Sequence, residues 1–200
     1  PKIHKKLPDP PGRPIISGVE GPTEKLSKLV DTWLQSHVKA LPSHVKDTTH
    51  MLNILNEWNA RYGPFSEATL VTIDVTSLYT SIPQHEMGEA IRHFMQLAPS
   101  PDTPPVDLVL KATDHIMQNN YFQFEGQIYH QIQGTAMGTP VAPSVANLFM
   151  GLLEQKILKN SPITVQAELW KRFIDDIFLL WLGSRGDLDA FLDYINTVHS

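Results

Sequence analysis

The sequence predicts a fold of the α+β class, in which helices and a small β-sheet share one core. Short runs rich in β-branched and aromatic residues, at 70–75 and 172–181, are typical of strands. Several longer segments carry apolar residues three and four positions apart, which is the spacing of amphipathic helices. The chain has 200 residues, 42% of them hydrophobic, which is enough for one compact core or for one domain in two lobes.

The run at 172–181 contains two adjacent carboxylates, Asp175 and Asp176, inside an otherwise apolar segment. In a regular strand they would point to opposite faces, so neither face would be fully apolar. Because a buried, unpaired carboxylate is costly, we expect the pair in a tight turn at the sheet surface or next to cations. A simple hairpin turn between two apolar strands is the alternative interpretation.

A third carboxylate, Asp74, ends the other strand-like run. Carboxylates brought together from different strands are oxygen ligands of the kind that Mg²⁺ prefers, and two such ions about 3.5–4 Å apart can drive in-line phosphoryl transfer. The sequence has no cysteine, so thiolate metal sites and disulfide bonds are excluded. The pattern therefore favours a magnesium-dependent phosphoryl-transfer site.

Helical spacing and turn residues predict the remaining elements. Residues 121–130 alternate around Glu125 and Gly126, which predicts a β-hairpin whose aromatic residues we expect in the core. Stacking of these rings on nucleic-acid bases is the alternative interpretation. In the second expected helix, Met51, Leu52, Ile54 and Leu55 are expected to face inward. The expected helices cover residues 24–41, 47–58, 84–97, 106–118, 143–150 and 187–199.

Several short motifs resemble those of reverse transcriptases, in the order and spacing of that family. Asp74 with Tyr79 five positions on resembles motif A, residues 133–140 (QGTAMGTP) resemble motif B, and residues 173–176 (FIDD) resemble motif C. Each motif alone is a weak signal, whereas several in the family's order are a strong one. More narrowly, the chain resembles the Penelope-like retroelements, the retrotransposon group closest to telomerase reverse transcriptase, at residues 2–5, 12–15, 77–80 and 135–140.

The resemblance implies a right-hand polymerase palm, an antiparallel sheet backed by helices, with fingers and without a thumb. Residues 1–68 would hold fingers motifs 1 and 2 with connecting helices, and residues 69–83 would hold palm motif A. Residues 84–132 would form the helices and hairpin of the fingers region, and residues 133–200 palm motifs B and C with the following helix. Thumb and endonuclease domains are expected in the full-length protein.

The resemblance also assigns catalytic roles to single residues. Asp74, Asp175 and Asp176 would be catalytic, and Asp176 would act less directly than the other two. The metal ligands would be Asp74, Asp175 and the backbone carbonyl of Val75. Tyr79 would be the steric gate, whose ring leaves no room for a 2′-hydroxyl and so selects dNTPs.

A further set of residues would bind the nucleotide by the same resemblance. Lys2 matches the motif 1 lysine, and Arg13 matches the motif 2 arginine, whose planar fork suits phosphate oxygens. Met137 stands where telomerase-like sequences often have Gln, so either Gln133 or Met137 takes that position. The full nucleotide-binding set is Lys2, Lys6, Arg13, Tyr79, Gln133, Gly134 and Gly138.

These assignments imply the core of an RNA-directed DNA polymerase from a retrotransposon. It would add dNTPs to a primer 3′-end with two Mg²⁺ ions, or with Mn²⁺. The expected partners are an RNA template, a DNA primer and dNTPs, with no membrane and, from the resemblance alone, in the nucleus.

Two alternative functions remain open at the level of sequence. The net charge of −5 is unfavourable for a protein that holds phosphate backbones, although basic residues gather in the first thirteen positions. An inactive or domesticated remnant that binds RNA or protein is the first alternative. A metal-dependent phosphodiesterase is the second, and it would leave motif B and Tyr79 unexplained.

Overall fold

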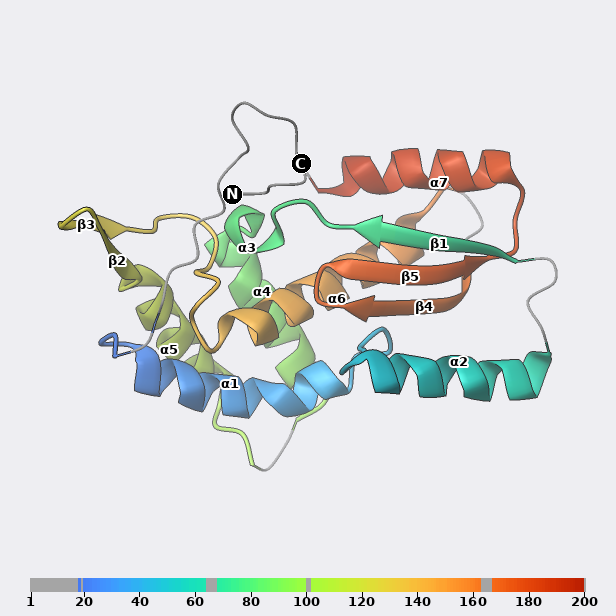
Figure 1. Cartoon of the computed structure of the whole chain (residues 1–200). Coiled ribbons are helices and arrows are strands. Elements are labelled where there is room, and N and C mark those ends of the chain that lie inside the picture. Colours follow the sequence, from blue (N-terminus) through green and yellow to red (C-terminus); the bar gives the residue numbers. More distant parts are fainter. Residues whose placement is uncertain (1–17, 19, 64–67, 100–101, 163–166, 200) are drawn as a thin grey trace.

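A three-stranded antiparallel sheet lies at the centre of the molecule (Figure 1). It is formed by β1 (Thr69–Asp74), β4 (Ala167–Phe173) and β5 (Asp176–Trp181), in the order β1-β5-β4. A separate hairpin joins β2 (Tyr121–Phe124) to β3 (Gln127–His130). The predicted α+β fold with a small antiparallel sheet is confirmed. This computed structural model describes residues 18, 20–63, 68–99, 102–162 and 167–199.

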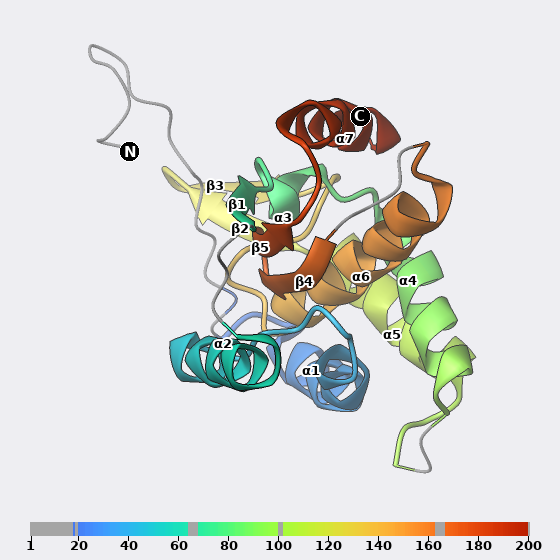
Figure 2. The same cartoon turned by 90° about the vertical axis from the view of Figure 1, so that its right-hand side faces the viewer.

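Helices cover one face of the central sheet, as the two perpendicular views show (Figures 1 and 2). The longest, α6, packs against α1 and α4, and α4 packs against α5. Beside α6, α7 packs on the same sheet face. The helices are α1 (Glu24–Lys39), α2 (Thr48–Tyr62), α3 (Leu78–Ser81), α4 (Gln84–Leu97), α5 (Val106–Gln118), α6 (Ala142–Asn160) and α7 (Arg185–Val198).

The core follows from the alternation of side chains along the strands. Residues Ile177, Leu179 and Trp181 of β5 are buried on the side of α6 and α7, and Phe191 of α7 stacks on Trp181 with ring centroids 5.4 Å apart. The opposite face of the sheet is left partly open, and Leu70 on that face is 64% exposed. One face of the sheet is thus core and the other is only partly covered, since Leu180 on that face is buried whereas its strand partner Leu70 is exposed.

Most of the predicted elements agree with the structure. The helices α4 and α5 begin and end at the predicted residues, and the hairpin turns at Glu125 and Gly126, both with positive φ. The short helix α3, which follows Ser77 at a φ of 56°, was not predicted. Within the described residues no helix is long and apolar enough to cross a membrane.

The prediction that α2 packs its apolar stripe into the core is wrong. No residue of α2 is buried: Met51, Ile54 and Leu55 are only half-buried, and Leu52 is 55% exposed. Helical spacing reveals an apolar stripe but does not say whether another element covers it. Here α2 lies beside the partly open face of the sheet, and Met51 is the α2 side chain that lines the cavity between them.

The prediction that the hairpin aromatics lie in the core is also wrong. Tyr121 is 52% exposed, and Tyr129 is exposed as well. The rings instead pair across the two strands: Tyr121 stacks on His130 at 4.7 Å and Phe122 on Tyr129 at 5.4 Å. Cross-strand pairs of this kind stabilise a two-stranded hairpin even where no other element covers its side chains.

Candidate active site

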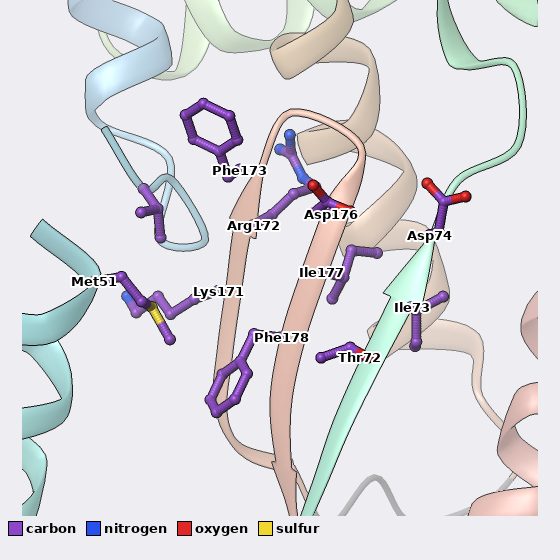
Figure 3. A pocket seen from close by; sticks show the side chains of 11 residues that line it. Met51, Thr72, Ile73, Asp74, Lys171, Arg172, Phe173, Asp176, Ile177 and Phe178 are labelled. Atoms are coloured by element: carbon purple, nitrogen blue, oxygen red, sulfur yellow. The ribbon is translucent and has the colours of Figure 1, made fainter. Parts of the chain in front are cut away.

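Asp74 and Asp176 lie side by side at one end of the central sheet (Figure 3). Asp74 is the last residue of β1, Asp176 is the first of β5, and the strand register pairs them directly. Phe173 of β4 pairs with Asp176 from the other side. A single regular strand would have put Phe173 and Asp176 on opposite faces. The turn between β4 and β5 interrupts that alternation, so the two residues are paired.

Ile174 and Asp175 form the turn, which confirms the predicted tight turn at the sheet surface for Asp175, whereas Asp176 lies outside it as the first residue of β5. Ile174 has a φ of 56°, which is rare for a β-branched residue and costs about 1–3 kcal/mol. The first turn residue of a type II′ hairpin needs such an angle. The carbonyl of Asp175 accepts a hydrogen bond from the Val75 N–H at 3.0 Å, which ties the turn to the end of β1.

The three carboxylates form a negatively charged cluster. Burial raises the pKa of Asp176, and the charges of Asp175 and Asp74 raise it further. Among the residues that the structure describes, no Lys, Arg or His forms an ion pair with any of the three. Like charges held together without a counter-charge are a binding place for cations.

The residues at this cluster fit a magnesium ion that arrives with its substrate. In the described part of the chain, no three His, Cys, Asp or Glu side chains are arranged to hold a metal by themselves. Mg²⁺, however, is usually bound by one or two carboxylates together with substrate phosphates, and it rarely needs a complete cage of protein ligands. Asp74, Asp175 and Asp176 offer only oxygen atoms, as that ion requires.

A cavity of about 490 Å³ opens beside the carboxylates, between the open sheet face and α2 (Figure 3). This volume is within the usual range of ligand clefts. Asp74 and Asp176 line it together with Thr72 and Phe178 of the neighbouring strand positions, and Met51 reaches it from α2. The partly open face of the sheet therefore gives a ligand access to the acidic cluster.

Tyr79 approaches the cluster from the motif A side. It lies on α3 and is half-buried, and burial together with the nearby Asp175 charge raises the pKa of its hydroxyl. Its backbone carbonyl accepts a hydrogen bond from the Thr135 N–H at 2.7 Å. Motif A and motif B thus contact each other directly at Tyr79, next to the motif C turn.

Gly134 permits this contact between motifs A and B. It has a φ of 68°, and a Cβ atom there would lie 2.7 Å from Cα and 2.8 Å from C of Thr80 and would also collide with the Tyr79 carbonyl. A glycine is needed for both reasons. Its expected contact with a nucleotide stays a prediction, whereas its contact with the motif A backbone is observed.

Four motif B residues border a second cavity, of about 350 Å³: Gln133, Thr135, Ala136 and Met137. Gln133 and Met137 both line it, so the two candidates for the motif B glutamine position face the same space. Gly138 lies next to Gly18: a Cβ atom added at Gly18 would be 2.9 Å from the carbonyl oxygen of Gly138. The predicted nucleotide-binding residues Lys2, Lys6 and Arg13 lie outside the described residues.

Sequence reasoning assigned no function to Arg172, which the structure buries completely behind the turn. Its guanidinium contacts Glu154 and Asn147 on α6 and the carbonyl of Ile174. One feature of the sequence could have indicated its importance: a permanently charged residue stands inside an apolar strand, two residues before the turn. A buried arginine needs hydrogen-bond acceptors or a carboxylate nearby. Its partners come from a helix that is distant in sequence, and the sequence does not identify them.

Comparison with known proteins gives a fold. No family model matches the sequence, and no curated protein matches it either. Among solved structures, the chain is similar to apo telomerase from Candida tropicalis, with a TM-score of 0.65 and 14% identity over 86% of this chain. The fold is similar to that of telomerase. A truncated form of the same enzyme gives a TM-score of 0.59 at 17% identity over 84% of this chain.

The telomerase-like fold covers only part of each telomerase. Telomerase from Candida albicans, solved in complex with the TWJ fragment of telomeric RNA, matches 88% of this chain with a TM-score of 0.60 and 10% identity. This chain spans 32–36% of the length of the three telomerase chains. The similarity therefore concerns one region of those larger proteins.

The contact at Gly134 gives a test of how motifs A and B are joined. Gly134→Ala is expected to lower the free energy of unfolding by about 2 kcal/mol or more, because it adds overpacking to an unfavourable φ. Gly126→Ala is the matched control, since Gly126 has a φ of 78° and no atom within 4 Å of its Cβ position. Urea denaturation measures both. Equal losses in the two variants would contradict the collision with Tyr79 and Thr80.

The charge cluster gives a test of pH dependence. Because the folded state raises the pKa of Asp176, its contribution to stability is present below the ordinary value of 3.8 and is lost as the pH rises through the folded pKa. Asp176→Asn is therefore expected to be more stable than the parent at pH 7 in EDTA, by at most about 1 kcal/mol at this exposed site. The difference should vanish at low pH. If Asp176→Asn is less stable than the parent at pH 7, the proposed repulsion among the three carboxylates is wrong. Asp193→Asn on α7 is the control for removing one negative charge elsewhere on the surface.

Proposed function

We propose that this chain is the catalytic core of an RNA-directed DNA polymerase. The observation that carries the proposal is the cluster of Asp74, Asp175 and Asp176, which brings motif A and motif C together within a telomerase-like fold. The residues of motif B contact motif A beside the same cluster. The resemblance of the motif sequences to Penelope-like retroelements supports an origin in a retroelement of that group.

The reaction is the addition of a dNTP to the 3′-end of a primer. Two Mg²⁺ ions, when bound, would activate the 3′-hydroxyl and stabilise the departing pyrophosphate. Asp74 and Asp175 would hold the ions with the carbonyl of Val75, and Asp176 would add negative charge beside them. Catalysis by this chain consists mainly of positioning and of charge complementarity, since phosphoryl transfer needs little else from the protein.

Selection of the nucleotide falls to motifs A and B. Tyr79 would be the steric gate, whose ring lies against the sugar of the incoming nucleotide and excludes a 2′-hydroxyl. The influence of the Asp175 charge on its hydroxyl supports this role, because it indicates that the ring is near the acidic cluster. Gln133 and Met137 both line the cavity next to Thr80, and one of them would take the motif B glutamine position. Gly134 and Gly138 shape the loop. Lys2, Lys6 and Arg13 neutralise the triphosphate.

The architecture follows the same proposal. Residues 69–83 and 133–200 form the palm, and residues 1–68 and 84–132 contribute the fingers. The partners are an RNA template and a DNA primer, and the site of action is the nucleus. Two of the similar telomerases were solved with telomeric RNA, which supports an RNA partner for this fold.

Primer extension tests the proposal. The protein in its full natural length is incubated with an RNA template, a DNA primer, Mg²⁺ and dNTPs, beside its Asp74→Asn and Asp175→Asn variants. Each variant is expected to lose at least about 10²-fold in rate, because metal-assisted charge stabilisation contributes several kcal/mol. Asp193→Asn changes the net charge equally at an exposed position of α7 and is expected to keep the parent rate.

Two results would contradict the polymerase assignment. If the parent protein binds RNA but extends no primer, the chain is a binding remnant. If the parent cleaves RNA in Mg²⁺ without any dNTP, and Asp175→Asn abolishes the cleavage, the same carboxylates serve a phosphodiesterase.

A further inference from the structure

Arg172 is buried between β4 and α6, and its side chain has no exposed area. Its Nε donates to Glu154 Oε1 at 2.8 Å, and its Nη2 lies 3.5 Å from Glu154 Oε2. Nη1 donates to Asn147 Oδ1 at 2.8 Å and Nη2 to the Asn147 backbone carbonyl at 3.1 Å. The guanidinium is therefore fixed to two positions of α6, the helix that follows the motif B loop.

The same guanidinium also binds the motif C turn. Nη1 donates to the backbone carbonyl of Ile174 at 3.0 Å. This carbonyl belongs to the peptide that leads into Asp175, and the next carbonyl, that of Asp175, accepts from the Val75 N–H. Two consecutive carbonyls of the turn are thus held, one from α6 through Arg172 and one from the end of β1.

The partners of Arg172 are themselves fixed. Glu154 accepts hydrogen bonds from Ser43 Oγ at 2.6 Å and from Trp170 Nε1 at 2.9 Å. The backbone of Arg172 exchanges hydrogen bonds with its neighbours, donating to the Ser43 carbonyl at 2.6 Å and accepting from the Val45 N–H at 2.9 Å. A network in which every member has its partners is rigid, so Arg172 has little freedom to shift.

Stability alone does not explain an arginine at this position. A buried ion pair is often no more stabilising than apolar residues of the same volume. Apolar residues, however, cannot donate a hydrogen bond to the Ile174 carbonyl. Ile174 has a strained backbone conformation, and such a conformation persists only where the surrounding structure holds it in place. The turn also carries the neighbouring negative charges of Asp175 and Asp176, which repel each other.

We propose that Arg172 is a positioning residue, which holds the Ile174–Asp175 turn, and with it Asp175, in the orientation that nucleotide addition requires. The inference rests on the proposed function for its catalytic consequence. The effect on the turn itself is independent of that function. It can be measured without substrate or metal.

Arg172→Lys tests the inference, because lysine keeps the charge beside Glu154 but has one nitrogen in place of the guanidinium fork. Amide hydrogen exchange is read at Val75, whose N–H reports on the Asp175 carbonyl. We expect exchange at Val75 to accelerate by about tenfold or more, while exchange at Leu148 within α6 keeps its protection. Arg185→Lys is the matched control, since Arg185 pairs with Asp189 on the surface.

Nucleotide addition supplies the second readout in the same full-length protein. The single-turnover rate of Arg172→Lys is expected to fall by about 10²-fold, the effect of misplacing a reacting group by about 1 Å. Binding of the primer–template should stay within about a factor of two, because the change concerns the chemical step and not the contacts with nucleic acid.

A second variant keeps the inference testable if Arg172→Lys fails to fold. Arg172→Met combined with Glu154→Gln removes both charges together. The amide oxygen can still accept from Trp170 Nε1, and the amide nitrogen can donate to Ser43 Oγ. We expect this double variant to fold, to lose the protection of the Val75 amide, and to add nucleotides as slowly as Arg172→Lys.

The outcomes separate the inference from the proposed function. Unchanged exchange at Val75 and an unchanged rate in a folded variant would overturn the positioning role. Faster exchange throughout α6 and the sheet would also overturn it, since Arg172 would then be merely structural. If Val75 alone loses protection while the unmodified protein adds no nucleotide, Arg172 still holds the turn and the polymerase function is wrong.

Discussion

The turn at Ile174 and Asp175 is the constraint on which the rest of the site depends. It must hold carboxylates next to each other at the end of a sheet, against their mutual repulsion, with one residue at a φ of 56°. The fold meets this demand from two sides. Val75 donates to one turn carbonyl and Arg172 to the other, so the strained conformation is determined by its surroundings.

Hydrogen bonds around the turn connect motifs A, B and C to one another. Motif A meets motif C where Val75 bonds to Asp175, and motif B meets motif A where Thr135 bonds to Tyr79. Arg172 completes these connections by linking the motif C turn to α6, which follows motif B. Residues that are far apart in sequence are thereby placed with few degrees of freedom, as electrostatic preorganisation of the proposed phosphoryl-transfer site requires.

Local patterns in the sequence were sufficient for most elements and for the acidic site. The strand ending at Asp74, the turn at Asp175 and the helices α4 and α5 all follow from spacing and turn chemistry. The burial of Arg172 and the open position of α2 did not follow, because both depend on which distant element packs against a segment. The hairpin rings were placed wrongly for the same reason: a strand pattern does not show whether a further layer covers it.

The most direct test of the account is to locate a metal at the strand ends. Crystals of the protein with a primer–template and a non-hydrolysable dNTP analogue can be soaked in Mn²⁺ and its anomalous signal mapped. The account predicts Mn²⁺ peaks at the carboxylates of Asp74 and Asp175, which disappear in Asp175→Asn crystals. Bound nucleotide without metal at these carboxylates, or Mn²⁺ peaks that persist unchanged in the variant, would contradict it.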